Sequence, residues 1–283
     1  MNQSGRIKKL FVMVQQMKQN KRLVAVRGAG DLATGVAYRL YKSGLDVIMT
    51  EIERPLVVRR AVSFAEAVYA KKVTIEGIEA GLAGSVEEAA TLLAKKAVPV
   101  LVDPAAAVVK QAGPAVLVDA RMAKRNLDTT IRDAPLVVGL GPGFTAGVDV
   151  HAVIETCRGH RLGRVIYSGG AIPDTGAPGA VDGYTLERLL RAPVDGVVAP
   201  RRTIGEQVKK GEVVAYVETI PVYAEMTGLL RGMLKEGTRV TRGTKIGDID
   251  PRPDAEYDTI SDKALAVGGG VLEAVYHFLN SNV

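Results

Sequence analysis

The stretch "VRGAGDLATGVAYRLYKSGLDVIMTE" (Val26–Glu51) decides the predicted fold class. It holds Gly28, Gly30 and Ala33 in the spacing G-x-G-x-x-G/A, between a short apolar run and a helical pattern. In that context the first glycine permits a tight turn, the second lets the backbone approach a pyrophosphate, and helix amides face the anion. Glu51 closes the next predicted strand, where an acid can hold ribose hydroxyls.

The first loop therefore supplies a set of candidate ligand-contacting residues: Gly28, Gly30, Asp31, Thr34, Gly35 and Glu51. Asp31 is the awkward member, because a carboxylate there repels phosphate unless a cation such as Arg27 compensates. A tight turn with no ligand is the alternative interpretation.

Strands and helices alternate over the first two thirds of the chain. Short apolar runs predict strands at 23–27, 46–51, 98–103, 115–120, 135–141 and 164–170. Helices are predicted at 85–97, where Ser85 and Glu88 form a capping box, and at 147–159. Continuous Val/Ile/Leu strands separated by helices predict an α/β domain with a Rossmann-like, mostly parallel sheet.

Two further glycine-rich segments follow predicted strands. The candidate residues in them are Gly139, Gly141, Gly143, Gly169, Gly170, Thr175 and Gly176. Because ligands of open α/β sheets bind outside the carboxyl ends of the strands, these segments and the first loop are expected to gather on one rim. No lysine follows the second segment in a G-K-[ST] arrangement, so it is not a Walker A loop.

No complete catalytic constellation is visible, and the catalytic residues stay unknown. His151, Cys157 and His160 form the only soft-ligand cluster, but Cys157 lies six residues after His151, a spacing that does not share a helix face. A packed or capping role is favoured over a metal site, with Glu155 as a partner for His151. One cysteine excludes an intrachain disulfide, which suits a cytoplasmic protein.

The sequence pattern changes near residue 191, where short Val-rich segments between glycines replace the helical patterns. "GVVAPRRTIGEQVKKGEVVAYVE" from Gly196 repeats as "GLLRGMLKEGTRVTRGTKIGDID" from Gly228, an offset of 32 residues. Two such halves are similar to the barrel-sandwich hybrid of lipoyl and biotinyl domains. The linker 219–227 contains no lysine, so a prosthetic-group carrier is disfavoured and a structural or docking role is expected.

Four segments result: a basic N-terminal arm (1–22), the Rossmann-like domain (23–190), the small β domain (191–253) and a C-terminal helical segment (254–283). The arm contains six basic and no acidic residues, which accounts for the whole net charge of +6. The basic balance therefore predicts no nucleic-acid partner. No apolar segment approaches the length of a membrane span, and the arm lacks a secretory signal pattern.

Several long blocks carry a resemblance to a known family. They are "VRGAGDLATGVAYRLYKSG", "RPLVVRRAVSFAEAVY", "PVLVDP", "GLGPGFTAGVDVHAVIETCRGHRLGRVIYSG", "TGAPG", "GTKIGDIDPR" and "ISDKALAVGGGVLEA". Over residues 22–275 the chain resembles the YqeB (EF2563) family of selenium-dependent molybdenum hydroxylase system proteins. The resemblance implies a pathway, the maturation of a hydroxylase, and no particular reaction or catalytic residue.

Three functions remain open. The first is an accessory factor that binds a nucleotide or molybdopterin-dinucleotide-like small anionic ligand at the rim and serves a molybdenum hydroxylase client. The second is an NAD(P)-dependent oxidoreductase. The third is a non-enzymatic scaffold whose glycine loops are empty. A homo-oligomer is compatible with all three.

Overall fold

The protein, seen as a computed structural model, is described over residues 11–17, 19–174, 176 and 179–281. The chain divides into two compact units, each with its own hydrophobic core. Unit 1 comprises the chain up to Pro55, Phe64–Asp174 and the residues from Ile260 on. Unit 2 comprises Leu56–Ser63 and residues 175–259.

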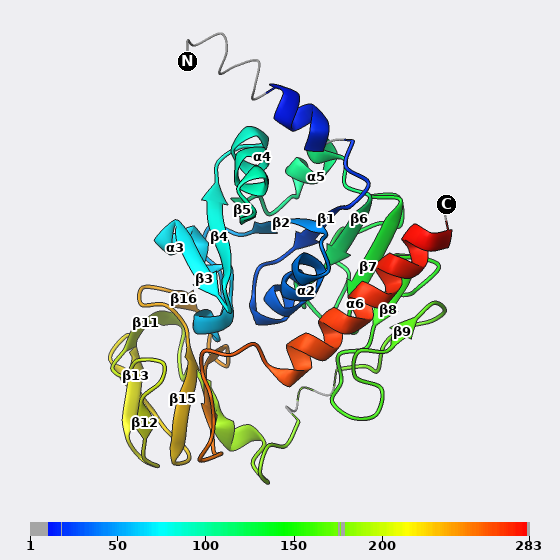
Figure 1. Ribbon diagram of the computed structural model, residues 1–283. Helices are drawn as coiled ribbons and strands as arrows, with labels where there is room; N and C mark the ends of the chain where they lie inside the picture. Colours follow the sequence, from blue (N-terminus) through cyan, green and yellow to red (C-terminus); the bar gives the residue numbers. More distant parts are fainter. Residues whose placement is uncertain (1–10, 18, 175, 177–178, 282–283) are drawn as a thin grey trace, which may run out of the picture. The chain divides into compact units, whose positions relative to one another are not determined.

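Unit 1 consists of a sheet with helices on both faces. Its elements in chain order are β1 (Leu23–Arg27), α2 (Asp31–Lys42), β2 (Asp46–Glu51), α3 (Glu66–Ala70), β3 (Lys72–Ile75), β4 (Ile78–Ala83), α4 (Val86–Ala94), β5 (Val98–Val102), α5 (Ala107–Ala112), β6 (Val116–Asp119), β7 (Leu136–Leu140), β8 (Ala152–Ile154), β9 (Val165–Ile166) and α6 (Asp262–Ser281). The nine strands lie in the order β3-β4-β5-β2-β1-β6-β7-β8-β9 (Figure 1).

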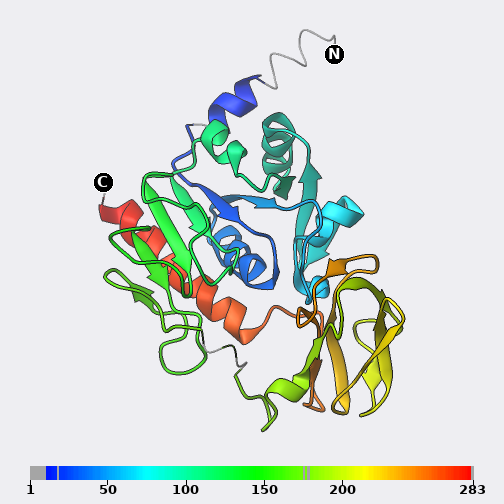
Figure 2. The same cartoon turned by 180° about the vertical axis from the view of Figure 1, so that it is seen from behind.

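The period of two along the strands separates the two faces of this sheet. Leu23 and Ala25 of β1 join the core that packs under α4 and α5, whereas Val24 and Val26 do not. The opposite face is covered by α2 and α6, which lie together across β1, β2, β7 and β8 (Figure 1). Figure 2 shows the same sheet from behind, with α4 and α5 nearer the viewer.

The predicted fold class, a Rossmann-like sheet with a lipoyl-like second domain, is wrong. The central strand pairs of unit 1 are parallel, but β3 runs antiparallel to β4 and β9 antiparallel to β8, so the sheet is mixed. Glu76 and Gly77, with φ of 44° and 79°, form the tight turn that folds β4 back on β3. This hairpin was not among the predicted strands.

The helix predicted over 147–159 is also wrong. The segment turns at Gly147 (φ 85°) and then forms strand β8, which is buried and pairs in parallel with β7. The Thr145 amide donates to the Asp149 carboxylate, and the His151 amide donates to the carbonyl of Val137. Without a helix after β8, the chain returns directly as β9, which makes this edge antiparallel.

Unit 2 consists of two antiparallel sheets. Its elements are η1 (Arg60–Val62), η2 (Leu186–Arg188), β10 (Leu189–Arg191), β11 (Gly196–Pro200), β12 (Gln207–Val208), β13 (Val213–Val217), β14 (Ile220–Tyr223), β15 (Gly228–Met233), β16 (Arg239–Val240) and β17 (Lys245–Asp250). The sheets have the orders β10-β17-β15-β12 and β14-β13-β11-β16.

The 32-residue repeat governs six of these strands. The strands β11, β12 and β13 begin 32 residues before β15, β16 and β17 respectively, and the halves exchange their second strands, so that β12 pairs with β15 and β16 with β11. However, β10 pairs with β17 and β14 with β13, and neither β10 nor β14 belongs to the repeat. The observed pair of four-stranded sheets therefore differs from the predicted barrel-sandwich hybrid by these two additional edge strands.

The helices α2 and α6 of unit 1 approach each other backbone to backbone. A Cβ atom added at Gly35 would lie 2.6 Å from the Cβ of Ala264, and one added at Gly268 would lie 2.6 Å from the carbonyl oxygen of Gly35. Ser261 begins α6 as an N-cap, because its Oγ accepts the Ala264 amide. The glycines therefore permit a contact that no larger residue allows.

Gly268→Ala should lower the free energy of unfolding by about 1–3 kcal/mol, because the new methyl group must push two helix backbones apart. Gly269→Ala, one position along the same helix, is the matched control: nothing lies within 4 Å of its Cβ position. It should be neutral or stabilise by up to about 1 kcal/mol through helix propensity. Urea denaturation of both variants measures the difference, and equal effects would contradict this account of the packing.

Candidate functional site

The loop after β1 leaves the amino end of α2 facing the carboxyl edge of the sheet. Gly28 has φ of 97°, and its amide donates to the carbonyl of Thr50 in β2. Gly30 is extended and caps α2, with no side chain bonded to the first-turn amides. No side-chain cap therefore competes for the first-turn amides of α2, and an anion contact at this helix N-terminus stays a prediction.

Glu51 closes this loop. Its Oε2 accepts the Ala29 amide at 2.9 Å and its Oε1 accepts the Ile52 amide at 2.8 Å. Burial raises the pKa of Glu51, and the two amide hydrogen bonds oppose that rise. In this arrangement the carboxylate ties β2 to the glycine loop, so the expected ribose contact would have to compete with two existing hydrogen bonds.

Thr34 and Gly35 lie inside unit 1. The Thr34 hydroxyl accepts the Phe64 amide at 2.9 Å and donates to the carbonyl of Ala29, and the residue is fully buried. Gly35 faces α6. Among the residues predicted for the first loop, these two therefore position the loop and the helix.

Arg27 does not compensate Asp31. Its Nη1 donates to Thr129 Oγ1 at 2.9 Å, and its Nη2 donates to Asp128 at 2.9 Å. Hydrogen bonding from Arg27 is the main reason that the pKa of Asp128 falls below its usual value. The expected Arg27–Asp31 pair is absent, because the arginine side chain holds the segment after β6 instead.

The cation near Asp31 is Lys263, from the first turn of α6. Burial lowers the pKa of this ammonium, with a smaller contribution from Arg158, while the charges of Asp31, Cys157 and Glu155 act in the opposite direction. Within the described part of the chain, Lys263 has no hydrogen-bond or ion-pair partner. A half-buried ammonium without a partner thus lies near the start of α2.

The loop after β8 contributes the remaining polar groups. Glu155 is 1% exposed; its Oε1 accepts the Cys157 amide and its Oε2 accepts the Ile172 amide. The expected Glu155–His151 pair is therefore wrong: His151 Nδ1 instead accepts the Val137 amide at 2.9 Å. Cys157 is exposed. Across the described residues, no group of three His, Cys, Asp or Glu side chains could hold a metal ion.

The second glycine segment follows β7, two strands away from β1 in the sheet. Parallel strands lie about 4.8 Å apart, so this segment and the first loop are separated by about 10 Å along the carboxyl edge. Added Cβ atoms at Gly139, Gly141 and Gly143 would meet Phe144, Thr156 and Arg125 respectively. Close packing therefore accounts for all three glycines.

The third glycine segment is joined to the second through Gly169, whose carbonyl accepts the Ala146 amide. Gly170 lies against the carbonyl of Phe144, and Gly176 has φ of 72° with open space around it. Thr175 lies outside the described residues. The segment thus borders the second loop, but a ligand contact from it stays a prediction.

A cleft of about 720 Å³ adjoins this edge, which the sequence did not predict. Its lining includes Ser85 and Glu88 at the start of α4 and Asp103 after β5. The Asp103 amide donates to the carbonyl of Glu51, which links the cleft to the first loop. The Asp103 carboxylate itself is engaged, since it accepts the Val108 amide at 2.7 Å.

Comparison with known proteins identifies one curated relative. No family model matches the chain. The sequence is 49% identical over 262 residues, or 92% of the chain, to "Uncharacterized protein YqeB" from Escherichia coli (strain K12), and the match covers 48% of that protein. The chain therefore spans about half the length of its relative. Over most of its length the chain is therefore similar to part of YqeB.

Similarity to solved structures is weak. The apo ectoine utilization protein EutE (DoeB) from Ruegeria pomeroyi is 10% identical with a TM-score of 0.24, covering 81% of this chain and 86% of that one. A succinylglutamate desuccinylase/aspartoacylase from Rhodobacter sphaeroides is 14% identical with a TM-score of 0.26, covering 82% and 86%. Scores this low support no argument about activity. In the described part of the chain, no helix has the length and apolarity needed to cross a membrane.

Glu51→Gln tests the role of the buried carboxylate. Because burial raises its pKa in the folded state, the stability contributed by protonated Glu51 is complete below the unfolded value of about 4.5 and is lost as the pH rises through the folded value. The unfolding free energy of the wild type minus that of Glu51→Gln should therefore fall between pH 4 and pH 7. Urea denaturation across this range, with the exposed Glu53→Gln as a charge control, measures it; a difference that rises with pH would contradict the assignment.

Proposed function

We propose that the protein is an accessory factor for the maturation of a selenium-dependent molybdenum hydroxylase. It binds a nucleotide or molybdopterin-dinucleotide-like anion at the carboxyl edge of the unit 1 sheet. The similarity to YqeB supports this proposal, because the resemblance to the YqeB family is what implies the maturation pathway. The hydroxylase client and any self-association are part of this proposal.

The observation that carries the binding proposal is the unpartnered ammonium of Lys263 near the start of α2. Open first-turn amides and a lysine side chain are both suited to a phosphate group. Lys263 also answers the objection raised by Asp31, because it supplies the compensating cation that Arg27 does not. A bound anion would give the ammonium of Lys263 its first direct partner.

A second candidate, a non-enzymatic scaffold, is favoured by a different observation. Glu51 already occupies the Ala29 amide, and Gly139, Gly141 and Gly143 are required for packing. A scaffold needs these contacts and no ligand. The same engagement of Glu51 removes the main support for an NAD(P)-dependent oxidoreductase, in which that acid would hold the ribose.

Native mass spectrometry of the freshly purified chain should reveal a phosphate-bearing small molecule, and Lys263→Gln should lose it. A variant that loses one charge-assisted contact is expected to bind at least about tenfold more weakly. Lys95→Gln, an exposed lysine at the end of α4, is the charge control and should retain the molecule.

Two results would count against the proposal. Purified wild-type protein that carries no ligand and binds neither a nucleotide nor a pterin dinucleotide by calorimetry would favour the scaffold. Full hydroxylase activity in cells that produce only Lys263→Gln would remove the link between the edge and maturation.

Cys157 offers a more specific version of the proposal, in which its exposed thiol is required for selenium handling. On that version Cys157→Ser should abolish hydroxylase activation and leave ligand binding unchanged, because only the charge groups contact the anion. Hydroxylase assays in cells, together with mass spectrometry of the variant, separate the two effects. If the Cys157→Ser variant still activates the hydroxylase, the role of the thiol is contradicted. The proposed role of Lys263 in anion binding would be unaffected by that result.

A further inference from the structure

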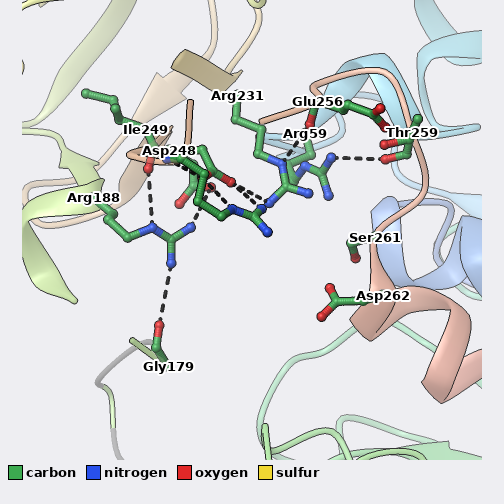
Figure 3. Close-up of polar contacts among 12 residues, drawn as sticks. Arg59, Gly179, Arg188, Arg231, Asp248, Ile249, Glu256, Thr259, Ser261 and Asp262 are labelled. Atoms are coloured by element: carbon green, nitrogen blue, oxygen red, sulfur yellow. Dashed lines mark hydrogen bonds and ion pairs between the residues drawn. The ribbon is translucent and has the colours of Figure 1, made fainter. Parts of the chain in front are cut away.

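Unit 2 contains a cluster of six charged side chains, four of them buried, that no part of the proposed function uses. We call it the arginine cluster: Arg188, Arg231, Lys245, Asp248, Asp250 and Arg252. Arg188 is 7% exposed and Arg231 8%, while Asp248 is 5% exposed and Asp250 fully buried. Figure 3 shows Arg188, Arg231 and Asp248 converging from η2, β15 and β17, with Arg59 nearby donating to the carbonyl of Thr259.

Each carboxylate of the cluster is shared by two cations. Asp248 accepts from Lys245 at 3.1 Å and from Arg188 at 3.4 Å. Asp250 accepts from Arg252 at 2.8 Å and from Arg231 at 3.1 Å. The two arginines that are more than nine-tenths buried therefore have the longer bonds in both pairs. Buried charges are costly unless fully compensated, so Arg188 and Arg231 lack the counter-charge that their burial calls for.

The remaining contacts of these two arginines go to carbonyl oxygens. Arg188 donates to Ile249 at 3.3 Å and to Gly179 at 3.5 Å (Figure 3), distances at the weak end for a hydrogen bond. Arg231 donates through Nε to Glu256 at 3.2 Å, and its Nη2 has no partner among the described residues. Burial lowers the pKa of Arg231, which fits a guanidinium with incomplete compensation.

The repeat shows that two of these charges have no charged counterpart in the first half. The residue 32 positions before Arg231 is Ala199, and the residue 32 positions before Asp248 is Tyr216. Both halves form the same strands in the same order. Arg231 and Asp248 therefore stand where the first half has uncharged side chains. Asp250 matches the acidic Glu218, and Arg188 lies before the repeat.

We propose that Arg188 and Arg231 bind a small oxyanion of the phosphate class. An oxyanion supplies the missing negative charge and accepts the free Nη2 donor of Arg231 in a geometry that guanidinium groups favour. The site belongs to unit 2 and is independent of the edge of the unit 1 sheet. Inorganic phosphate and a phosphate ester both present such an oxyanion. AMP is the probe for a phosphate ester.

The test measures calorimetric binding of inorganic phosphate and of AMP to the full chain. Arg188→Gln and Arg231→Gln should each weaken binding at least about tenfold, as expected for loss of a charge-assisted contact. Arg239→Gln, an exposed arginine on β16 of the same unit, is the matched control and should bind like the wild type. If inorganic phosphate binds, the ligand of the site is the free ion. If only AMP binds, the ligand is a phosphate ester.

Further variants keep the test decisive. Arg231→Lys preserves the charge but not the paired donors, so it should fold and bind with intermediate affinity even if Arg231→Gln fails to fold. The proposed site in unit 1 keeps Lys263 in both arginine variants, so only the binding that is lost in Arg188→Gln and Arg231→Gln is assigned to unit 2. Binding that neither arginine variant alters, or no binding of inorganic phosphate or AMP by the wild type, would overturn the proposal.

Discussion

The close packing of α2 against α6 is the contact on which unit 1 depends. Gly35 and Gly268 let the two helix backbones touch, and this contact brings residues more than 200 positions apart in the sequence to the same edge of the sheet. It also brings Lys263, in the first turn of α6, near the start of α2. A larger residue at either glycine would separate the helices and displace the cation, so packing and the candidate anion site share one cause.

Glu51 shows how one residue type can serve two roles. An acid at the end of the second strand is typical of ribose recognition, and the sequence alone does not distinguish that role from a structural one. In the structure the carboxylate accepts the Ala29 and Ile52 amides, and it connects β2 to the loop after β1. The loop is therefore held in shape from within the protein, and the proposed ligand would contact the first turn of α2 instead.

The two units differ in how their buried arginines are paired with carboxylates. In unit 1, Arg27, Asp128 and Thr129 form a network in which the arginine is buried and its acid partner is half exposed. In unit 2, two carboxylates each serve two cations, and the arginines are the more poorly compensated partners. The first half of the internal repeat forms the same strands with Ala199 and Tyr216 in place of Arg231 and Asp248.

The sequence by itself determined the features that local chemistry controls. The turn at Gly28, the helix that follows it, the Ser85 cap of α4 and the 32-residue repeat are all visible from spacing and residue type. Tertiary structure decided the rest. Residues 147–159 became loop and strand because β8 pairs with β7, and hairpins at both edges made the sheet mixed. The partners of Glu51, Arg27 and Lys263 likewise depend on segments distant in the chain, and no local pattern encodes which of those segments will meet.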